Sequence, residues 1–496
     1  MAMWLCLLIA VITIAFSIKL VNKSTKAKLP PCPQAIPIIG RFLWLTKPVH
    51  RFESILCSLN LPIITVFLGP QTAIFIKSCT LAHRALIENG TVFADRPKWL
   101  YSRQFIDSYQ LTISSERYGV TWRILRRNFG ETIHPSRIKS FTHVRRRVLG
   151  ALLIRLESDA QVGAVQVMDH FHFAVFSLLA RMCFYDDLED DHINEIKTVH
   201  RSLLLSFKKY EILHLWRALT RILLRSWWKE YVKKRRDQVE VILPFIRARK
   251  QLKMAAKLNH VTSYVDTLSE LIMQVDGNTR KLTEHEIVSL CSEFINAGTD
   301  TTATALQWIM ANIVKYPNVQ DKLYQEIRDV VGVEAKEVHE EDLPKLSYLR
   351  ATVLEALRRH PPGQFLLPHG VTEQTKLGGH LVPKNATVNV MVAPIGRDPE
   401  VWENPMEFMP ERFLGEAFDI TGSKEVKMIP FGVGRRICPA YGLAMLHMEY
   451  FVANLVWKFE WKVAERDEVD LTEKTEYTVV MKRPLRAEIS RRENKI

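Results

Sequence analysis

A cysteine near the carboxyl end of the chain stands in surroundings that suit metal ligation. Cys438 lies in FGVGRRICPAYGLA, residues 431–444, after a turn rich in glycine and arginine and before an apolar run. Gly432 and Gly434 let the backbone turn tightly and approach another group closely. A thiolate just before a helix is stabilised by backbone N–H groups and by the positive end of the helix dipole. A lone cysteine most often packs as a small apolar side chain, but these neighbours favour a metal ligand.

One thiolate by itself cannot hold zinc or an iron–sulfur cluster, because those sites need several protein ligands. It can be the single protein ligand of a haem, whose in-plane ligands belong to the macrocycle. The chain has seven cysteines, at positions 6, 32, 57, 79, 183, 291 and 438, and no C-x-x-C pair. This scatter argues against a disulfide framework or a zinc cluster. His170 and His172 alternate at strand spacing, and no nearby ligand set completes a metal site with them.

An acid and an alcohol stand side by side in AGTDTT, residues 297–302. An acid that feeds a hydroxyl can deliver protons to a ligand on a metal, so we expect Asp300 and Thr301 to form a proton relay. Glycine costs about 1 kcal/mol against alanine inside a helix, and we expect Gly298 to make room there for a small ligand on the metal. The alternative is a polar stripe, or a helix distorted by threonines that bond back to the preceding turn. The presence of Cys438 favours the relay.

These residues need long helices to position them. Thr283 and Glu286 form a capping box, and no proline interrupts the helical pattern until Pro317. The sequence therefore predicts a helix over 284–315, about 48 Å long at about 1.5 Å per residue, which can line a central site. A second helix is expected after Cys438, in LAMLHMEYFVANLVW. The small and apolar residues that recur at helical spacing in the first helix are Ile287, Cys291, Phe294, Gly298, Thr301 and Ala305.

The rest of the chain predicts a mainly helical fold with a small β-rich part. Residues 66–78 alternate like a strand–turn–strand around Gly69 and Pro70, and residues 115–360 are mainly helical in pattern. Strand-like pieces and turns dominate residues 364–395, and short strands around a turn fill the last part of the chain. We find no internal repeat.

The spacing F-x-x-G-x-R-x-C, formed by Phe431, Gly434, Arg436 and Cys438, resembles the haem loop of the cytochrome P-450 superfamily. The family pattern ends in glycine two residues after the cysteine, where this chain has Ala440. The resemblance implies haem b (iron protoporphyrin IX), with the thiolate of Cys438 as the axial ligand of the iron. It also implies the mainly α fold of that family.

Further motifs match the family in chain order, including WRILR at 122–126, AGTDTT at 297–302, EALR at 355–358 and PERF at 410–413. Asp300 and Thr301 then take the oxygen-activating role. Glu355 and Arg358 share one helix face at i, i+3, and with Arg412 the resemblance implies a supporting ion network. The resemblance also implies cofactor contacts by Trp122, Arg126, His369, Arg436, Phe431, Gly434 and Ala297. Taken singly, a charged residue or a histidine of this set would be an ordinary surface charge or a core histidine.

The first eighteen residues, MAMWLCLLIAVITIAFSI, carry no charge and are followed by lysines at 19, 23, 26 and 28. This predicts a transmembrane signal anchor over 1–20 with the body on the cytosolic side. A cleaved signal peptide and a buried core helix are the alternatives. A basic, proline-rich hinge over 21–40 and a single haem-thiolate domain over 41–496 complete the expected organisation. The resemblance to membrane-bound plant members implies a single-pass protein of the endoplasmic reticulum membrane.

The formal net charge of +14 over 496 residues favours acidic partners. The chain has no flavin or nicotinamide fingerprint, because its Gly-Val-Gly lacks a third glycine and a βαβ setting. Electrons must therefore come from a partner. The resemblance implies NADPH–cytochrome P-450 reductase, through which alone NADPH and flavins take part, with cytochrome b5 as a possible second partner. A nucleic-acid module lacks any recognition motif and conflicts with the anchor.

Together these features indicate a haem-thiolate monooxygenase that acts on an apolar substrate, which the plant resemblance makes a specialised metabolite. The alternatives are a reductase-independent isomerase or dehydratase and a non-enzymatic membrane haem protein. The intact acid–alcohol pair argues against both. By resemblance, substrate contacts fall in 101–115, 204–214, 290–301, 364–367 and 477–480, although core packing explains each residue equally well. The candidates are Phe105, Phe207, Phe294, Phe365, Leu366 and Tyr477.

Overall fold

The computed structural model divides the chain into two compact units. The first joins Met1–Pro97 to Pro368–Val390, and the second joins Lys98–Leu367 to Met391–Ile496. No helix among the described residues is long and apolar enough to cross a membrane, and the predicted anchor, 1–20, lies outside them. Of the predicted hinge over 21–40, only residues 29–32 are described. The structure describes residues 29–32, 55–68, 71–98, 104–105, 108–109, 111–185, 187–206, 217–254, 262–275, 277–415, 417–465 and 467–492.

The first unit is built on a four-stranded sheet with the order β1-β2-β11-β8. The predicted strand–turn–strand is confirmed, since β1 and β2 pair antiparallel with Leu68 opposite Gln71. Strand β11 pairs parallel to β2, and β8 pairs antiparallel to β11. The elements of this unit are β1 (Ile63–Leu68), β2 (Gln71–Ile76), α4 (Cys79–His83), the π-helix η1 (Arg84–Glu88), β8 (His369–Gly370), β9 (Thr375–Leu377), β10 (His380–Val382) and β11 (Thr387–Val390).

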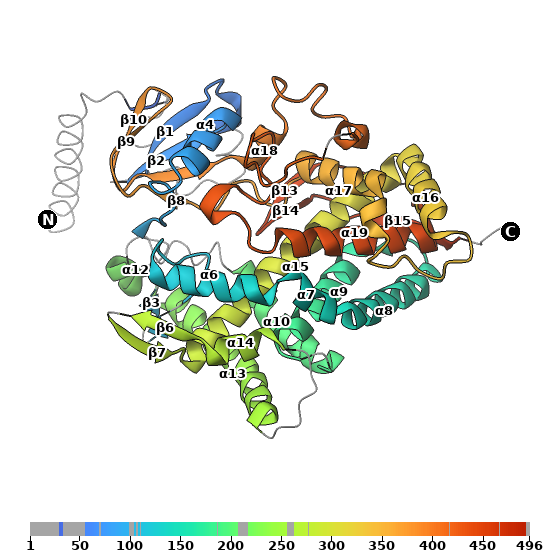
Figure 1. Ribbon diagram of the computed structural model, residues 1–496, viewed down its shortest axis with the longest axis horizontal. Helices are drawn as coiled ribbons and strands as arrows, with labels where there is room; N and C mark the ends of the chain where they lie inside the picture. Colours follow the sequence, from blue (N-terminus) through green and yellow to red (C-terminus); the bar gives the residue numbers. More distant parts are fainter. Residues whose placement is uncertain are drawn as a thin grey trace, which may run out of the picture. The chain divides into compact units, whose positions relative to one another are not determined.

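The second unit is mainly helical, as the sequence predicts (Figure 1). Its helices are α6 (Val120–Thr132), α7 (Pro135–Ser140), α8 (Thr142–Ala160), α9 (Val167–Cys183), α10 (Asp190–Leu205), α12 (Arg217–Leu223), α13 (Arg225–Met254), α14 (Tyr264–Glu270), α15 (Glu284–Lys315), α16 (Pro317–Val331), α17 (Ser347–Arg359), α18 (Val392–Gly396) and α19 (Tyr441–Lys458). Three short 3-10 turns are η2 (Leu343–Lys345), η3 (Pro410–Phe413) and η4 (Gly434–Arg436).

The strands of the second unit form small sheets among these helices. Strand β15 pairs antiparallel with both β12 and β5, and the other strands form two-stranded pairs, β3 with β4, β6 with β7 and β13 with β14. The strands are β3 (Gln104–Phe105), β4 (Ser108–Tyr109), β5 (Val165–Gln166), β6 (Ile272–Val275), β7 (Asn278–Lys281), β12 (Phe459–Val463), β13 (Glu473–Thr475), β14 (Val479–Met481) and β15 (Arg486–Arg491).

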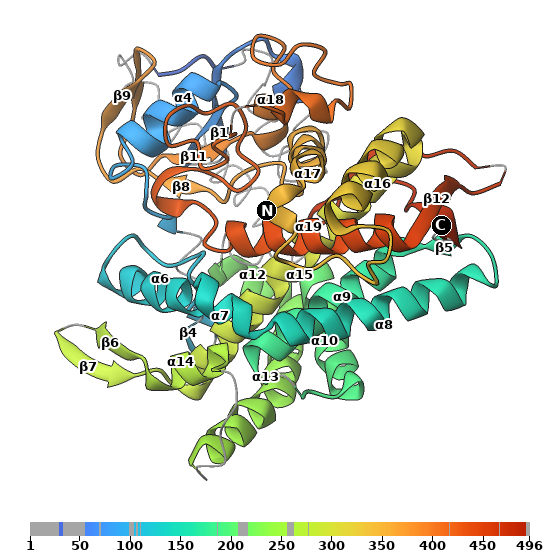
Figure 2. The same ribbon diagram turned by 45° about the vertical axis from the view of Figure 1, so that its right-hand side comes forward.

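Helix α15 is the axis of the second unit, and its bounds are those predicted from the sequence. Thr283 and Glu286 form the predicted capping box, which fixes the helix start. Every residue from 302 to 314 is buried, as expected for a helix enclosed by other elements on all sides. Those elements include α9, α13, α17 and α19, and α15 runs between α9 and α19 (Figure 2). Any side chain exposed in the middle of α15 therefore needs an explanation.

Candidate active site

The loop before α19 holds Cys438 in a fixed position. Gly432 and Gly434 have φ angles of 70° and 71°, in the left-handed region that favours glycine. The backbone N–H of Cys438 donates to the carbonyl of Phe431 at 2.8 Å, so the loop closes on itself. Helix α19 begins at Tyr441, which confirms the helix expected after the cysteine.

Two groups oppose the effect of burial on the Cys438 thiol. Burial raises the pKa of Cys438, whereas a hydrogen bond from the backbone of Ala440 and the charge of Arg126 act to lower that pKa. The Arg126 Nη2 atom donates to the carbonyl of Ile437 at 2.6 Å, one residue before the cysteine. Both groups stabilise the thiolate, which is the form that ligates a metal.

The cysteine loop and α6 are joined through Trp122. Its ring centroid lies 4.6 Å from Cζ of Arg436 and 5.9 Å from Cζ of Arg126. The Arg436 guanidinium also donates to the carbonyl of Glu116 at 2.7 Å and to that of Ile113 at 3.3 Å. The structure thus brings together two motifs about three hundred residues apart in sequence, and the contact of Arg436 with the cofactor remains a prediction.

His369 belongs to the first unit. It is buried, and its ring atom Nδ1 lies 2.7 Å from the carbonyl oxygen of Phe93. The neighbouring Gly370 accepts no side chain, because a Cβ there would lie 2.8 Å from the backbone of Arg96. This packing fixes the imidazole within its own unit, and its predicted contact with the cofactor remains a prediction.

The predicted ion network forms on α17 and η3. The Glu355 side chain is fully buried and receives two hydrogen bonds from Arg358, at 2.6 and 2.7 Å, and one from the Met409 backbone N–H at 2.9 Å. Arg412 Nε lies 3.4 Å from the same carboxylate. The remaining Arg358 donors bond backbone carbonyls, including that of Gly396 at 2.8 Å. The network therefore ties α17 to the loops that lead toward the cysteine.

Helix α15 exposes a short window halfway along its length. Ala297 is exposed and both Asp300 and Thr301 are half-buried, although the helix is covered on both sides of this stretch. The Thr301 hydroxyl donates to the carbonyl of Ala297 at 2.6 Å, so the back-bonding left open by the sequence does occur. The lone pairs of that hydroxyl remain able to accept a proton from Asp300 or from water.

Gly298 has a packing role that the sequence does not show. A Cβ at this position would lie 2.6 Å from Cδ1 of Leu179 on α9. The missing side chain therefore allows α9 and α15 to approach closely. Our expectation that it makes room for a ligand on the metal remains a prediction.

The sequence missed His172 as a neighbour of the acid–alcohol pair. Residues 167–183 form the helix α9 and not a strand, so His170 and His172 point in different directions. His170 bonds Asp159 at 2.8 Å, whereas Nε2 of His172 lies 3.6 Å from Oδ1 of Asp300. Helical periodicity through the apolar run around these residues was the signal that could have shown this.

The candidate substrate residues differ in their surroundings. Phe294 is buried in an aromatic cluster, 5.7 Å from the ring of Phe129 and 5.3 Å from that of Tyr264, which is the core packing left open by the sequence. Phe207 lies outside the described residues, and the structure describes the backbone of Phe105 in β3 but not its side chain.

Three other candidates lie around the cysteine loop and α15. The Leu366 side chain lies beside Gly432, with Cδ2 3.6 Å from where a Cβ on that glycine would be. Phe365 is half-buried and forms a β-bridge with Met391. Tyr477 is exposed, and the next residue, Thr478, contacts α15 through a 2.9 Å hydrogen bond with Thr304. Their contact with substrate remains a prediction.

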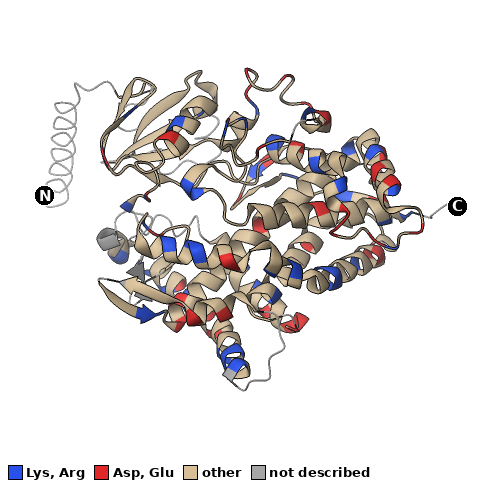
Figure 3. Ribbon diagram, in the orientation of Figure 1, with Lys and Arg blue, Asp and Glu red and all other residues tan. Residues whose placement is uncertain are grey.

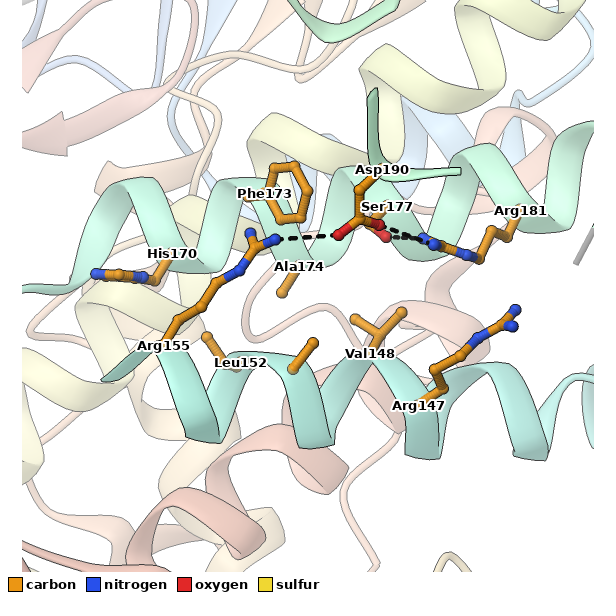
Figure 4. Close-up of a pocket in the computed structure, with 11 residues that line it drawn as sticks. Arg147, Val148, Leu152, Arg155, His170, Phe173, Ala174, Ser177, Arg181 and Asp190 are labelled. Atoms are coloured by element: carbon orange, nitrogen blue, oxygen red, sulfur yellow. Dashed lines mark hydrogen bonds and ion pairs between the residues drawn. The ribbon is translucent and has the colours of Figure 1, made fainter. Parts of the chain in front are cut away.

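A cavity of about 180 Å³ lies between α8 and α9 (Figure 4). Asp190 at the start of α10 accepts hydrogen bonds from Arg155 at 3.1 Å and from Arg181 at 2.9 Å. Arg155 also lies over the ring of Phe173, with Cζ 4.0 Å from its centroid. Because these charges pair with one another, we assign the cavity a structural role in joining the three helices.

The residues of the second unit fit a haem held by Cys438. The thiol has two groups that favour its thiolate, and the guanidiniums near Trp122 suit the carboxylates of a macrocycle. The exposed, small side chain of Ala297 suits the close approach of a flat group to α15. This donor set, one soft thiolate with arginines beside it, is that of a haem-thiolate protein.

Comparison with known proteins agrees with this class. The family model for cytochrome P450 matches residues 30–490, so the chain belongs to the cytochrome P450 family. The chain is 46% identical over 502 residues to cytochrome P450 89A9 of Arabidopsis thaliana, covering 97% of this chain and 98% of that protein. It is 32% identical over 497 residues to isoflavone 2'-hydroxylase of Medicago truncatula, covering 98% and 96% of the two chains.

A further relative and a solved structure extend the comparison. Geraniol 8-hydroxylase of Swertia mussotii is 30% identical over 476 residues, covering 94% of each chain. A zebrafish cytochrome P450 solved with progesterone has the same fold, with a TM-score of 0.74 at 22% identity over 90% of this chain and all of that one. The protein is therefore a monooxygenase of this family that carries haem b on a cysteine thiolate.

Proposed function

We propose that this protein oxidises an apolar plant specialised metabolite, with Asp300 and Thr301 as the proton relay. The overall reaction is RH + O₂ + 2 H⁺ + 2 e⁻ → ROH + H₂O, so each turnover consumes two protons at a site that must otherwise exclude water. The observation that carries the proposal is the window on α15, where an acid and an alcohol, Asp300 and Thr301, are both left partly uncovered near Ala297.

Each residue has one task in this scheme. Haem, bound through Cys438, supplies the activation of dioxygen. Arg126 and the backbone of Ala440 support the thiolate. Thr301 turns its hydroxyl from the Ala297 carbonyl toward the site and passes on a proton received from Asp300.

The substrate class is supported by the relatives and by the apolar candidates. Isoflavone 2'-hydroxylase and geraniol 8-hydroxylase are named for largely apolar compounds. Phe365, Leu366 and Tyr477 are the described candidates for contact with such a substrate, because apolar and aromatic side chains bind it by burial of its surface.

The electrons come, in this proposal, from NADPH–cytochrome P450 reductase, with cytochrome b5 as a second donor. Basic positions recur along α6 (Figure 3), and Arg435 and Lys424 are exposed near the cysteine loop, which suits an acidic partner. We also propose residues 1–20 as a single-pass anchor in the endoplasmic reticulum membrane, 21–40 as its hinge, and 41–496 as the domain facing the cytosol.

The test uses microsomes that contain this protein and a plant reductase. With NADPH and a plant metabolite extract, the wild type should give a thiolate-type ferrous–CO spectrum and a product that has gained one oxygen atom. C438A should lose both. T301A should keep the spectrum but give about 10-fold less product for each NADPH consumed. This loss is smaller than the full contribution of general acid catalysis, about 10²–10⁴-fold, because water can still donate protons. T301S should retain coupling. Product formed without NADPH and O₂ would contradict the proposal.

A further inference from the structure

Two histidines approach the partly exposed face of α15 from neighbouring helices. His172 on α9 has Nε2 3.6 Å from Oδ1 of Asp300. His200 on α10 has Nδ1 3.0 Å from Oδ1 of Asn296, which lies one helical turn before Asp300. The acid proposed for the relay thus belongs to a polar group that spans three helices.

Both imidazoles are enclosed by protein. His172 is 3% exposed and His200 is 1% exposed, and Phe176 lies between them, stacked on the first ring and edge-on to the second. Within the described part of the chain, Nδ1 of His172 and Nε2 of His200 have no hydrogen-bond partner. A buried polar atom without a partner costs about 1–3 kcal/mol, so apolar side chains here would make a more stable core. The presence of a histidine at position 172 on α9 must therefore be explained by the groups that this side chain faces.

We propose that His172 is the positioning residue for Asp300, a role that rests on the proposed proton relay. Its Nε2–H holds the carboxylate in the orientation from which the acid reaches Thr301, one residue along α15. The 3.6 Å separation is longer than a direct hydrogen bond. In this proposal the two groups close to hydrogen-bond distance during turnover, because catalytic hydrogen bonds often tighten in the reacting complex.

The packing of α9 against α15 keeps His172 beside Asp300. Gly298 lets the two helices approach, as its contact with Leu179 shows. His172 lies at the same interface between α9 and α15, about two helical turns before Leu179, and has Asp300 as its neighbour there. The glycine of the motif and the histidine on α9 are therefore parts of one arrangement.

The test compares four variants in the microsomal assay and in unfolding. H172F removes the N–H donor, and H172Q retains an amide donor about as far along the side chain as Nε2. D300N removes the acid, and H172F/D300N combines both changes. H170F is the matched control on the same helix, because His170 lines the cavity between α8 and α9 (Figure 4) and bonds Asp159 instead of Asp300.

The expected result is a loss of product per NADPH that depends on Asp300. H172F should lower coupling about 10-fold with an unchanged ferrous–CO spectrum, since misplacement by 1 Å can cost up to about 10²-fold. H172Q should stay within about 3-fold of the wild type, and H170F should not differ from it. In the D300N background, H172F should change coupling by less than about 2-fold, because a residue that acts through Asp300 has nothing left to position.

Two coupling results would overturn the proposal. One is an equal loss from H172F with and without Asp300, and the other is an H172Q variant as poor as H172F. The unfolding measurements keep the pairing testable if the relay itself is wrong. If D300N and T301A leave coupling unchanged, the relay fails, yet non-additive unfolding midpoints for H172F and D300N would still show that the two side chains interact. Additive midpoints would refute the contact itself.

Discussion

The change of Gly298 to alanine distinguishes two explanations for the glycine in AGTDTT. If the glycine is needed for helix packing, the added methyl group collides with Leu179. Its Cβ would lie 2.6 Å from Leu179 Cδ1, whereas carbon atoms in ordinary contact lie about 3.5–4.0 Å apart. One helix or the leucine must therefore shift by about 1 Å, and Leu179 is itself buried at 2% exposure.

The expected cost is a difference between two opposing effects. Overpacking of a buried site costs about 1–3 kcal/mol, and replacing glycine by alanine within a helix gains about 1 kcal/mol. G298A should therefore lower the free energy of unfolding by about 0–2 kcal/mol. In L179A the collision partner is gone, so the same change should raise it by about 1 kcal/mol. The gap between the two backgrounds, about 1–3 kcal/mol, is the interaction free energy of the pair.

The assay is denaturant unfolding of the four proteins in the cycle, followed by circular dichroism and by haem absorbance. Gly150 on α8 is the matched control, because a Cβ there would meet nothing within 4 Å. G150A should stabilise the protein by about 1 kcal/mol. If G298A stabilises as much as G150A in both backgrounds while coupling falls, then the packing explanation is wrong and the glycine does make room for the ligand.

Two further changes test the supports of the site. R358M leaves the buried Glu355 carboxylate without its main partner, so it should lower the free energy of unfolding by about 3–5 kcal/mol and abolish most of the ferrous–CO signal. The control R350M removes a half-exposed arginine on the same helix and should lower the free energy of unfolding by less than about 1 kcal/mol. Equal losses in the two variants would show that the network has no special role. Burial and the charge of Arg145 lower the pKa of His447 to about 3. The imidazole therefore stays neutral in the folded chain, whereas in the unfolded chain it takes up a proton near pH 6.5. The free energy of unfolding should consequently fall as the pH drops from 7 to 5. In H447N the free energy of unfolding should fall less steeply over that pH range. An unchanged slope would rule out this histidine as a source of the acid sensitivity.

Much of the fold and of the cysteine site could be predicted because their signals are local. The capping box at Thr283 marks the start of α15 and Pro317 marks the end, and both signals act within a single turn of helix. The glycines before Cys438 have the positive φ angles that only a local turn demands. Glu355 and Arg358 lie three residues apart on α17, so their spacing in the sequence also predicts that they pair.

The rest depended on contacts between segments far apart in the chain. The alternation of His170 and His172 suggests strand spacing, because a single pair of residues is too short to establish either period. Only the packing of α9 on α15 shows that His172 faces Asp300 and that Gly298 faces Leu179. Likewise, the aromatic cluster around Phe294 assembles from three helices, so no local pattern could separate a core residue from a pocket residue.

By itself the sequence determined which side chains are available: the thiolate ligand, the acid–alcohol pair and the helix caps, since each depends on neighbours within a few residues. The tertiary structure decided what those side chains face. It paired Arg126 with the loop of Cys438 and placed a buried histidine beside Asp300. Such pairings depend on how closely two helices can approach, which is set by side-chain volume across the interface and not by the sequence of either helix alone.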